Sequence, residues 1–386
     1  MSYPYHVMAK PTGAICNLDC AYCFFLSKEK LYLGSDFRMS DEVLREYIKQ
    51  YVQSQPTPEV TITWQGGEPT LMGLDFFEKA TEYANEYKQH RQRVSFAIQT
   101  NGVLLDDDWG KFLRKNRYLV GISIDGTEAL HDTYRRDKGG KPTFKRVIAG
   151  LNILKKYRVE TNILCTVNAA NGDHPLEVYR FFRDELQSAY IQFIPVVERE
   201  DGGVTERSVR PQQWGNFLTA IFDEWIKRDV GHVFIPTFES ALANFYGVPA
   251  GICVFNETCG SALALEHNGD LYACDHYVDP DYLLGNIANT PMAELVTSEK
   301  QQQFGQAKKD DLPQYCRDCE VRFACHGECP KNRFAKTPDG EAGLNYLCEG
   351  YKFFFRHIDE PMRFMAQELQ MQRSPANVMR LFRDTD

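Results

Sequence analysis

Short apolar stretches alternate with longer amphipathic stretches from the N-terminus to Lys227. The apolar stretches have the length and composition of strands, and the amphipathic ones have the periodicity of helices. Because parallel strands need crossover connections, this alternation predicts a parallel sheet. The predicted strands are Tyr5 to Ala9, Val60 to Trp64, Ser95 to Gln99, Leu119 to Ile124, Thr161 to Val167 and Tyr190 to Pro195.

The predicted helices are Ser40 to Val52, Leu74 to Tyr87, Asp106 to Lys115, Thr143 to Lys156, Pro175 to Glu185 and Pro211 to Lys227. Ser40 precedes two acidic residues and has the chemistry of a helix N-cap, and Pro211 suits a first helical turn. Six strand–helix units rather than eight predict an α/β fold with a partial (β/α)6 TIM-like barrel, open on one side. The polar stretch from Glu198 to Val209 predicts a loop.

Three cysteines follow the first predicted strand in the order C-x3-C-x2-C, at Cys16, Cys20 and Cys23. Three thiolates can hold a [4Fe–4S] cluster and leave one iron without a protein ligand, where chemistry can take place. The alternative is a zinc knuckle or chance clustering. Zinc usually takes four ligands, and no further Cys or His lies close by in the sequence. We therefore favour a cluster with one open iron.

Of the 12 cysteines in the chain, Cys165 lies in an apolar stretch and is predicted to be a small buried residue. The remaining eight lie in the C-terminal part, enough for two four-cysteine sites, and part of them forms the run C-x2-C-x5-C-x3-C-P from Cys316 to Pro330. The alternatives are two zinc sites or a disulfide framework. Residues Met1 to Thr12 do not resemble a signal peptide, and the reduced thiols of the cytosol favour metal binding.

Polar residues and glycines gather where predicted strands end, which is the functional end of such barrels. Gly66 and Gly67 allow a ligand to approach the backbone closely, and Glu68 adds an acceptor for an ammonium group. The alternative for this Gly-Gly-Glu-Pro segment is a simple strand-to-helix turn. Two further polar segments, Gln99 to Gly102 and Ser123 to Gly126, end the next two strands.

The composition narrows the classes of partner. The formal net charge of −9 disfavours a nucleic-acid substrate, although it leaves room for a small basic groove. No apolar run approaches the ~20 residues that span a bilayer, so no membrane partner is expected. We expect a cytoplasmic protein with a substantial buried core.

The cysteine motif with its preceding aromatic, followed by Gly-Gly-Glu-Pro at the end of the next strand, resembles the signature of the radical S-adenosylmethionine (SAM) enzymes. The resemblance implies that SAM binds at the open iron. Single positions match the SAM site of that family, and the alternative for Arg135 is a solvated charge. The implied SAM-binding residues are Tyr22, Gly66, Gly67, Glu68, Ser123, Arg135 and Val197.

The C-terminal cysteines resemble the SPASM domain, which holds two auxiliary [4Fe–4S] clusters. The chain as a whole is most similar to the anaerobic sulfatase-maturating enzymes. The segments that carry this likeness are Lys10 to Gly13, Thr63 to Leu71, Gln99 to Gly102, Gln192 to Ile194, Glu266 to His276 and Leu344 to Cys348. The resulting expectation is a radical SAM partial barrel at 1–235, a smaller cysteine-rich SPASM domain at 236–365 and a helical tail at 366–386.

The resemblance implies three [4Fe–4S] clusters and assigns the C-terminal ligands. It places Cys253, Cys259, Cys274 and Cys329 on the first auxiliary cluster, and Cys316, Cys319, Cys325 and Cys348 on the second. Spacing alone would equally allow Cys316, Cys319, Cys325 and Cys329 together. One position departs from the family, because Phe25 stands where many relatives have tyrosine.

The implied reaction oxidises a Cys or Ser side chain of a sulfatase polypeptide to Cα-formylglycine, with one-electron reduction by a flavodoxin or ferredoxin. Asp275 is the implied base, and its alternative is a solvated turn carboxylate. Gln65 and Gln99 are expected to bind the backbone of the peptide. The competing functions are another SPASM peptide modifier that forms thioether or other crosslinks, a nonenzymatic iron–sulfur or zinc protein, and a radical SAM enzyme acting on RNA.

Overall fold

The computed structural model describes residues 4–382 of the chain. These residues form two compact units that are interleaved along the sequence. Unit 1 contains the residues up to Ser123 together with Tyr134–Thr161 and Gly260–Gln306, and unit 2 contains Ile124–Thr133, Asn162–Cys259 and the residues from Ala307 on. The predicted domains are consecutive instead, and their boundaries stay a prediction.

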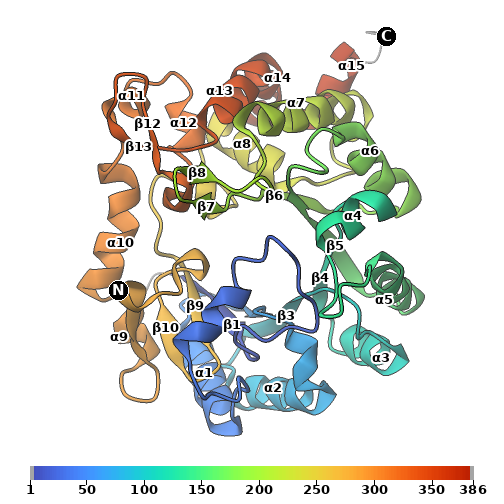
Figure 1. The fold of residues 1–386 in the computed structure, drawn as a ribbon, viewed down its shortest axis with the longest axis vertical. Helices are drawn as coiled ribbons and strands as arrows, with labels where there is room; N and C mark the ends of the chain where they lie inside the picture. Colours follow the sequence, from blue (N-terminus) through green and yellow to red (C-terminus); the bar gives the residue numbers. More distant parts are fainter. Residues whose placement is uncertain (1–3, 383–386) are drawn as a thin grey trace. The chain divides into compact units, whose positions relative to one another are not determined.

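Unit 1 is built on a β-sheet in which the strands β1 to β4 lie side by side (Figure 1). Its strands are β1 (His6–Lys10), β2 (Glu59–Trp64), β3 (Arg93–Thr100), β4 (Leu119–Ser123), β9 (Ala262–Glu266), β10 (Asp270–Tyr272) and β11 (Leu283–Asn286). The order is β11-β10-β9-β1-β2-β3-β4. The pairs from β9 to β4 are parallel, and β10 pairs antiparallel with β9 and β11. The predicted parallel pairing is confirmed for β1 to β4.

Helices follow the strands of unit 1 as predicted. They are α1 (Asp41–Ser54), α2 (Leu74–Tyr87), α3 (Asp107–Lys115), α5 (Phe144–Lys156) and α9 (Met292–Val296), with short 3-10 helices η1 (Leu26–Leu31), η2 (Pro69–Met72), η5 (Asp275–Tyr277) and η6 (Pro280–Tyr282). The predicted cap is confirmed, because Ser40 Oγ accepts a hydrogen bond from the Val43 amide at 3.3 Å. Aromatic side chains form the core between helices and sheet. Trp64 of β2 is fully buried and meets the rings of Tyr47 and Phe77 edge-on.

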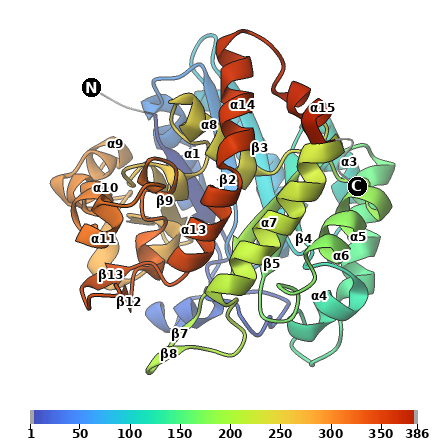
Figure 2. The ribbon, with the colours of Figure 1, turned by 90° about the horizontal axis from the view of Figure 1, so that it is seen from above.

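Unit 2 contains the pair β5 (Glu160–Val167) and β6 (Ile191–Pro195), which is parallel from Ile163 onward. The long helix α7 (Pro211–Arg228) lies beside α13 (Cys348–His357), as the views in Figures 1 and 2 agree. Phe222, Phe238 and Phe354 join α7, α8 (Pro236–Tyr246) and α13 in one aromatic core. The other helices are α6 (Pro175–Arg180), α11 (Gln314–Arg317), α12 (Arg322–Cys325), α14 (Asp359–Gln370) and α15 (Met379–Phe382), with short helices η3 (Phe181–Glu185), η4 (Cys253–Phe255), η7 (Pro330–Asn332) and η8 (Pro375–Val378).

Three elements contain residues of both units, and several others differ in detail from the predictions. α4 (Glu128–Tyr134), β5 and α10 (Glu299–Asp310) contain residues of both units. The predicted helix from Pro175 to Glu185 ends in a π-helical turn, η3. The predicted loop after β6 contains a small hairpin of β7 (Arg199–Glu200) and β8 (Gly203–Val204), and β12 (Ala335–Lys336) pairs with β13 (Ala342–Leu344). In the predicted helical tail, residues 383–386 lie outside the described residues.

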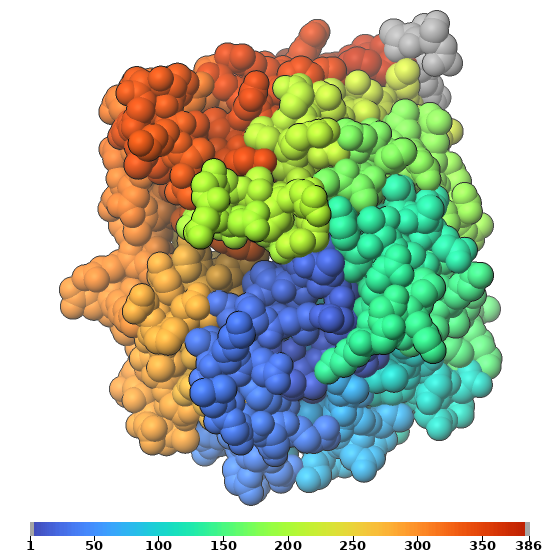
Figure 3. Space-filling view, in the orientation of Figure 1, coloured from blue at the N-terminus to red at the C-terminus, as the bar shows by residue number. Residues whose placement is uncertain are grey.

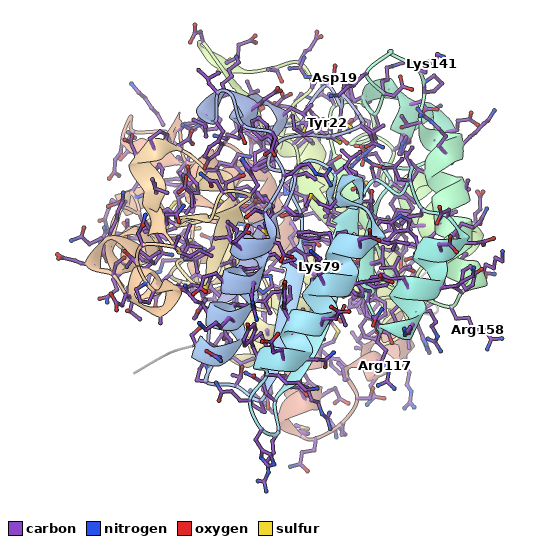
Figure 4. The ribbon with its side chains drawn as sticks, turned by 90° about the horizontal axis from the view of Figure 1, so that it is seen from below. Asp19, Tyr22, Lys79, Arg117, Lys141 and Arg158 are labelled. Atoms are coloured by element: carbon purple, nitrogen blue, oxygen red, sulfur yellow. The ribbon has the colours of Figure 1, made fainter. Side chains whose placement is uncertain are left out.

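The two ends of the unit 1 sheet are easily located in Figure 4. Arg117 and Arg158 precede β4 and β5, so they mark the N-terminal ends of the strands. Tyr22, Asp19 and Lys141 lie at the opposite end of the view (Figure 4). The loop that carries the first three cysteines therefore lies at the C-terminal ends of the strands, where the sequence predicts the functional site.

Candidate active site

The cysteine loop follows β1 and is held by backbone hydrogen bonds to the last residue of α4 and to the segment after it. The amides of Asp19 and Ala21 donate to the carbonyls of Arg136 and Tyr134 at 2.8 and 3.0 Å. Cys16 Sγ accepts from the Leu18 amide at 3.4 Å and from Asn101 Nδ2 at 3.7 Å. Burial raises the pKa of Cys16 to about 12. The loop thus places Cys16 inside unit 1, next to the end of β3.

The Gly66–Gly67 turn lies directly against this loop. The Gly67 and Glu68 amides donate to the carbonyls of Gly13 and Ile15 at 2.8 and 2.9 Å. A Cβ on Gly67 would lie 2.0 Å from the Ile15 carbonyl oxygen, and Gly66 has a φ of +126°. Both glycines are therefore required by the local backbone. The close approach of a ligand to this turn stays a prediction.

The carboxylate of Glu68 is buried and fully engaged within unit 1. Its Oε1 accepts from the Thr70 amide, the Thr70 hydroxyl and the Thr100 hydroxyl at 3.1, 2.6 and 2.7 Å, and its Oε2 accepts from the Asn101 amide at 2.8 Å. Burial raises the pKa of Glu68, and these hydrogen bonds oppose that rise. Glu68 consequently ties the ends of β2 and β3 together. Direct binding of an ammonium group by Glu68 stays a prediction.

Other residues of unit 1 that were predicted to bind SAM or the peptide also contact each other. The guanidinium of Arg135 lies 5.6 Å from the ring centroid of Tyr22, and both side chains are buried. Gln99 Nε2 donates to Ser123 Oγ at 3.0 Å, which joins β3 to β4. The side-chain oxygen of Gln65 is buried and has no hydrogen-bond partner within residues 4–382. Val197 belongs to unit 2, where it is buried just beyond β6.

Asp275 begins η5 in unit 1, directly after Cys274. It forms an ion pair with Lys10, the last residue of β1, and its side chain is 13% exposed. This ion pair was not predicted from the sequence, because Lys10 and Asp275 are remote in the chain. The solvated-turn alternative for Asp275 describes a free surface carboxylate, whereas this carboxylate is paired and mostly buried.

Four cysteines of unit 2 line one cavity. They are Cys316, Cys319, Cys325 and Cys348. Burial raises the pKa of Cys348 to about 12 and raises that of Cys325 further. Cys329 does not line this cavity. These four are the cysteines that the family resemblance places on the second auxiliary cluster, and their role as its ligands stays a prediction.

The other cysteines are divided between the units. Cys253, Cys259 and Cys329 belong to unit 2 and Cys274 to unit 1. The buried Lys308 donates to the carbonyls of Cys253 and Val254 at 2.7 and 2.9 Å, which fixes the start of η4. Cys165 is fully buried, as predicted.

The geometry of the cysteines bears on the kind of metal group that they fit. All 12 are free thiols, so the structure contains no disulfide framework. Within residues 4–382, no three His, Cys, Asp or Glu side chains lie close enough to hold a single metal ion. The four thiols that line the cavity of unit 2 match the donor set that a [4Fe–4S] cluster needs.

Similarity to known proteins extends over almost the whole chain. Residues 11–182 match the Radical SAM superfamily, and residues 253–320 match an iron–sulfur cluster-binding domain, SPASM. A serine-type anaerobic sulfatase-maturating enzyme of Bacteroides thetaiotaomicron is 47% identical, with 99% of this chain and 96% of that protein covered. This chain belongs to the anaerobic sulfatase-maturating enzymes. A cysteine-type member from Clostridium perfringens is 34% identical over 92% of this chain and 96% of its own length.

Solved structures agree with this membership. The structure of native anSMEcpe with bound AdoMet and Cp18Cys peptide has a TM-score of 0.86 at 33% identity, with 95% of this chain and all of that chain covered. Streptococcus suis SuiB with S-adenosylmethionine has a TM-score of 0.62 at 15% identity and shares the fold alone. The predicted partial barrel with a SPASM domain is thereby confirmed.

As an anaerobic sulfatase-maturating enzyme, the chain is a radical SAM oxidoreductase. SAM and [4Fe–4S] clusters are the cofactors of this family, and the count of three clusters follows from it. None of the helices in residues 4–382 combines the length and the apolar character needed to cross a membrane. The individual ligand and substrate roles stay predictions.

Proposed function

We propose that this chain oxidises a Cys or Ser side chain of a sulfatase polypeptide to Cα-formylglycine. The observation that carries the proposal is 47% identity over 99% of the chain to a serine-type anaerobic sulfatase-maturating enzyme. A cysteine-type member is 34% identical, so the proposal covers both targets. The net charge of −9 suits a substrate motif that contains arginine, such as Cys or Ser followed by x-Pro/Ala-x-Arg.

The proposed SAM site lies at the C-terminal ends of the unit 1 strands. Cys16, Cys20 and Cys23 hold the first cluster, and the backbone of Gly66 and Gly67 receives the methionine end of SAM. The other proposed contacts are Tyr22, Glu68, Ser123, Arg135 and Val197. SAM bound there supplies a 5′-deoxyadenosyl radical, which removes a hydrogen atom from Cβ of the target residue.

The remaining steps are assigned to residues of this chain. Gln65 and Gln99 bind the peptide backbone so that the target Cβ is presented to the SAM site. Asp275 takes the thiol or hydroxyl proton. Auxiliary clusters held by the C-terminal cysteines would take up one further electron, which leaves an aldehyde from serine or a thioaldehyde from cysteine that water hydrolyses to the aldehyde. A cytoplasmic flavodoxin or ferredoxin supplies the electron that reduces the first cluster.

A mass-spectrometric assay with matched peptides tests the proposed reaction. Reconstituted protein with SAM and reductant should lower the mass of a serine peptide by about 2 and of a cysteine peptide by about 18, because an aldehyde replaces the alcohol or thiol. The product should also react with a hydrazine probe. An Ala peptide of the same sequence is the control and should keep its mass.

The crosslinking alternative gives a different result in the same assay. A thioether crosslink would cost a cysteine peptide about two hydrogens and leave no carbonyl for the hydrazine probe. A modified peptide that does not react with the probe would therefore contradict formylglycine formation and favour the crosslinking function.

The iron content tests the proposed ligand sets. Three clusters of four irons predict about twelve irons per chain after anaerobic reconstitution. Replacing Cys325 and Cys348 with alanine should remove about four irons, because both line the cavity of unit 2. Cys165→Ala is the matched control, since Cys165 is buried outside these sets, and should keep the full content. An unchanged iron count in the double variant would contradict the second auxiliary site.

A further inference from the structure

Lys10 is a buried cation at the end of β1, and the proposed mechanism gives it no role. Its side chain is 2% exposed, and its ammonium group forms an ion pair with Asp275. Burying a charge away from water costs free energy unless an opposite charge pairs with it. The position of the Lys10 ammonium group is therefore set by the group with which it pairs. The mostly buried carboxylate of Asp275 likewise needs a cation as its partner.

The surroundings of Lys10 direct its ammonium group toward Asp275. The group lies 4.0 Å from the ring centroid of Phe25, which offers a cation–π contact but no hydrogen-bond acceptor. The neighbour of Lys10 on β9 is Glu266, but Glu266 Oε2 lies 3.2 Å from His267 Nδ1 instead. Asp275 is the carboxylate with which Lys10 forms its ion pair.

The backbone holds both ends of this contact firmly. Lys10 lies at the end of a strand that pairs with β9 over five residues. Asp275 begins the short helix η5 three residues after the last residue of β10, and β10 pairs with β9 in turn. The ion pair therefore links β1 to the short helix that follows β10, across the intervening strand β9, and fixes the direction of the Asp275 carboxylate relative to β1.

We propose that Lys10 is a positioning residue for Asp275, which it holds by the buried ion pair in the orientation that receives the substrate proton. The inference rests on the proposed function, in which Asp275 is the base. Asp275 remains 13% exposed, so the pair leaves part of the carboxylate accessible. Lys10 itself, at 2%, is covered.

The test compares Lys10→Met with wild type in the peptide assay. The methionine keeps an apolar stem of similar length over Phe25 and removes the charge. We expect 5′-deoxyadenosine to form at near the wild-type rate and the formylglycine made per 5′-deoxyadenosine to fall on the order of tenfold. Lys10→Gln, which restores a hydrogen-bond donor, should recover part of that ratio. A wild-type ratio in Lys10→Met, or an equal loss of both products, would overturn the proposal.

Lys28→Met is the matched control. Lys28 forms an ion pair with Asp279 at 2.8 Å, and the segments that carry these two residues lie side by side on the surface of unit 1 (Figure 3). This pair has the same chemistry as that of Lys10, but Asp279 is 46% exposed. The control variant should keep the wild-type ratio of formylglycine to 5′-deoxyadenosine.

A double-mutant cycle separates this inference from the proposed function. Adding Lys10→Met to Asp275→Asn should not lower the product ratio further, and it should lower the melting temperature less than Lys10→Met does alone. Additive losses in the melting temperature would contradict the ion pair. If the wild-type protein makes no formylglycine, the proposed function fails, while the melting temperatures still decide whether Lys10 and Asp275 are coupled. If Lys10→Met does not retain iron, the cycle is carried out with Lys10→Gln.

Discussion

Asp275→Asn should still cleave SAM to 5′-deoxyadenosine but make little formylglycine, with the product falling on the order of a hundredfold. Removal of the Cβ hydrogen depends on the first cluster, whereas completion of the oxidation needs a group that takes the side-chain proton. Asparagine keeps the shape of the aspartate and cannot accept that proton. Quantifying both products from one anaerobic reaction measures the effect.

The control for this variant is Asp279→Asn, which changes an acid on the same segment that is 46% exposed and pairs with Lys28. It should leave the ratio of the two products unchanged. Near-wild-type formylglycine from Asp275→Asn would show that Asp275 is not the base.

Gly67→Ala should lose most SAM cleavage, by at least about tenfold. A Cβ at this position would lie 2.0 and 2.4 Å from the carbonyl oxygen and carbon of Ile15, which are backbone atoms that cannot rotate away. Overpacking of this kind costs about 1–3 kcal/mol. Because Ile15 precedes Cys16, the strain falls on the loop that carries the cluster ligands. Formation of 5′-deoxyadenosine, measured together with iron content, reports the loss.

Gly203→Ala provides the matched comparison, because a Cβ there meets no atom within 4 Å. It should keep both SAM cleavage and iron content. Wild-type cleavage by Gly67→Ala would mean that the turn can move away from the cysteine loop, and it would remove the steric argument for glycine at this position.

Much of the barrel is predictable from the sequence because local patterns decide it. The predicted strand from Val60 to Trp64 differs from β2 by one residue, and the predicted helix from Leu74 to Tyr87 is α2 without change. Apolar periodicity, an N-cap and a first-turn proline act within a few residues of each other, so they are visible in the sequence.

The extension of the sheet by β9 to β11 was not predicted. β9 lies more than two hundred residues after β1 in the sequence, yet it pairs with β1 in parallel. No local pattern in Ala262 to Glu266 indicates its partner, because register between distant strands is set by packing in the folded sheet. The Lys10–Asp275 ion pair depends on this pairing and was hidden for the same reason.

Some features of the candidate site could likewise be predicted from the sequence, and others could not. The cysteines and the glycine turn are recognisable from spacing, and the family resemblance supplies the membership of the ligand sets. The hydrogen bonds of the Glu68 carboxylate were not foreseeable, because Thr100 and Asn101 come from the next strand. Sequence patterns identify residue types at strand ends, but the contacts among them require the fold.

The hydrogen bonds of the Glu68 carboxylate reduce the conformational entropy that the Gly66–Gly67 turn would lose if a cofactor bound there. Four hydrogen bonds from Thr70, Thr100 and Asn101 fix the turn as the chain folds. The conformational freedom of the Gly66–Gly67 backbone is therefore already lost before any ligand arrives. A preorganised turn spares the ligand the free energy of ordering it, so more of the contact energy appears as affinity. Gly66 and Gly67, although they are flexible residues, are thus held in one conformation by the fold.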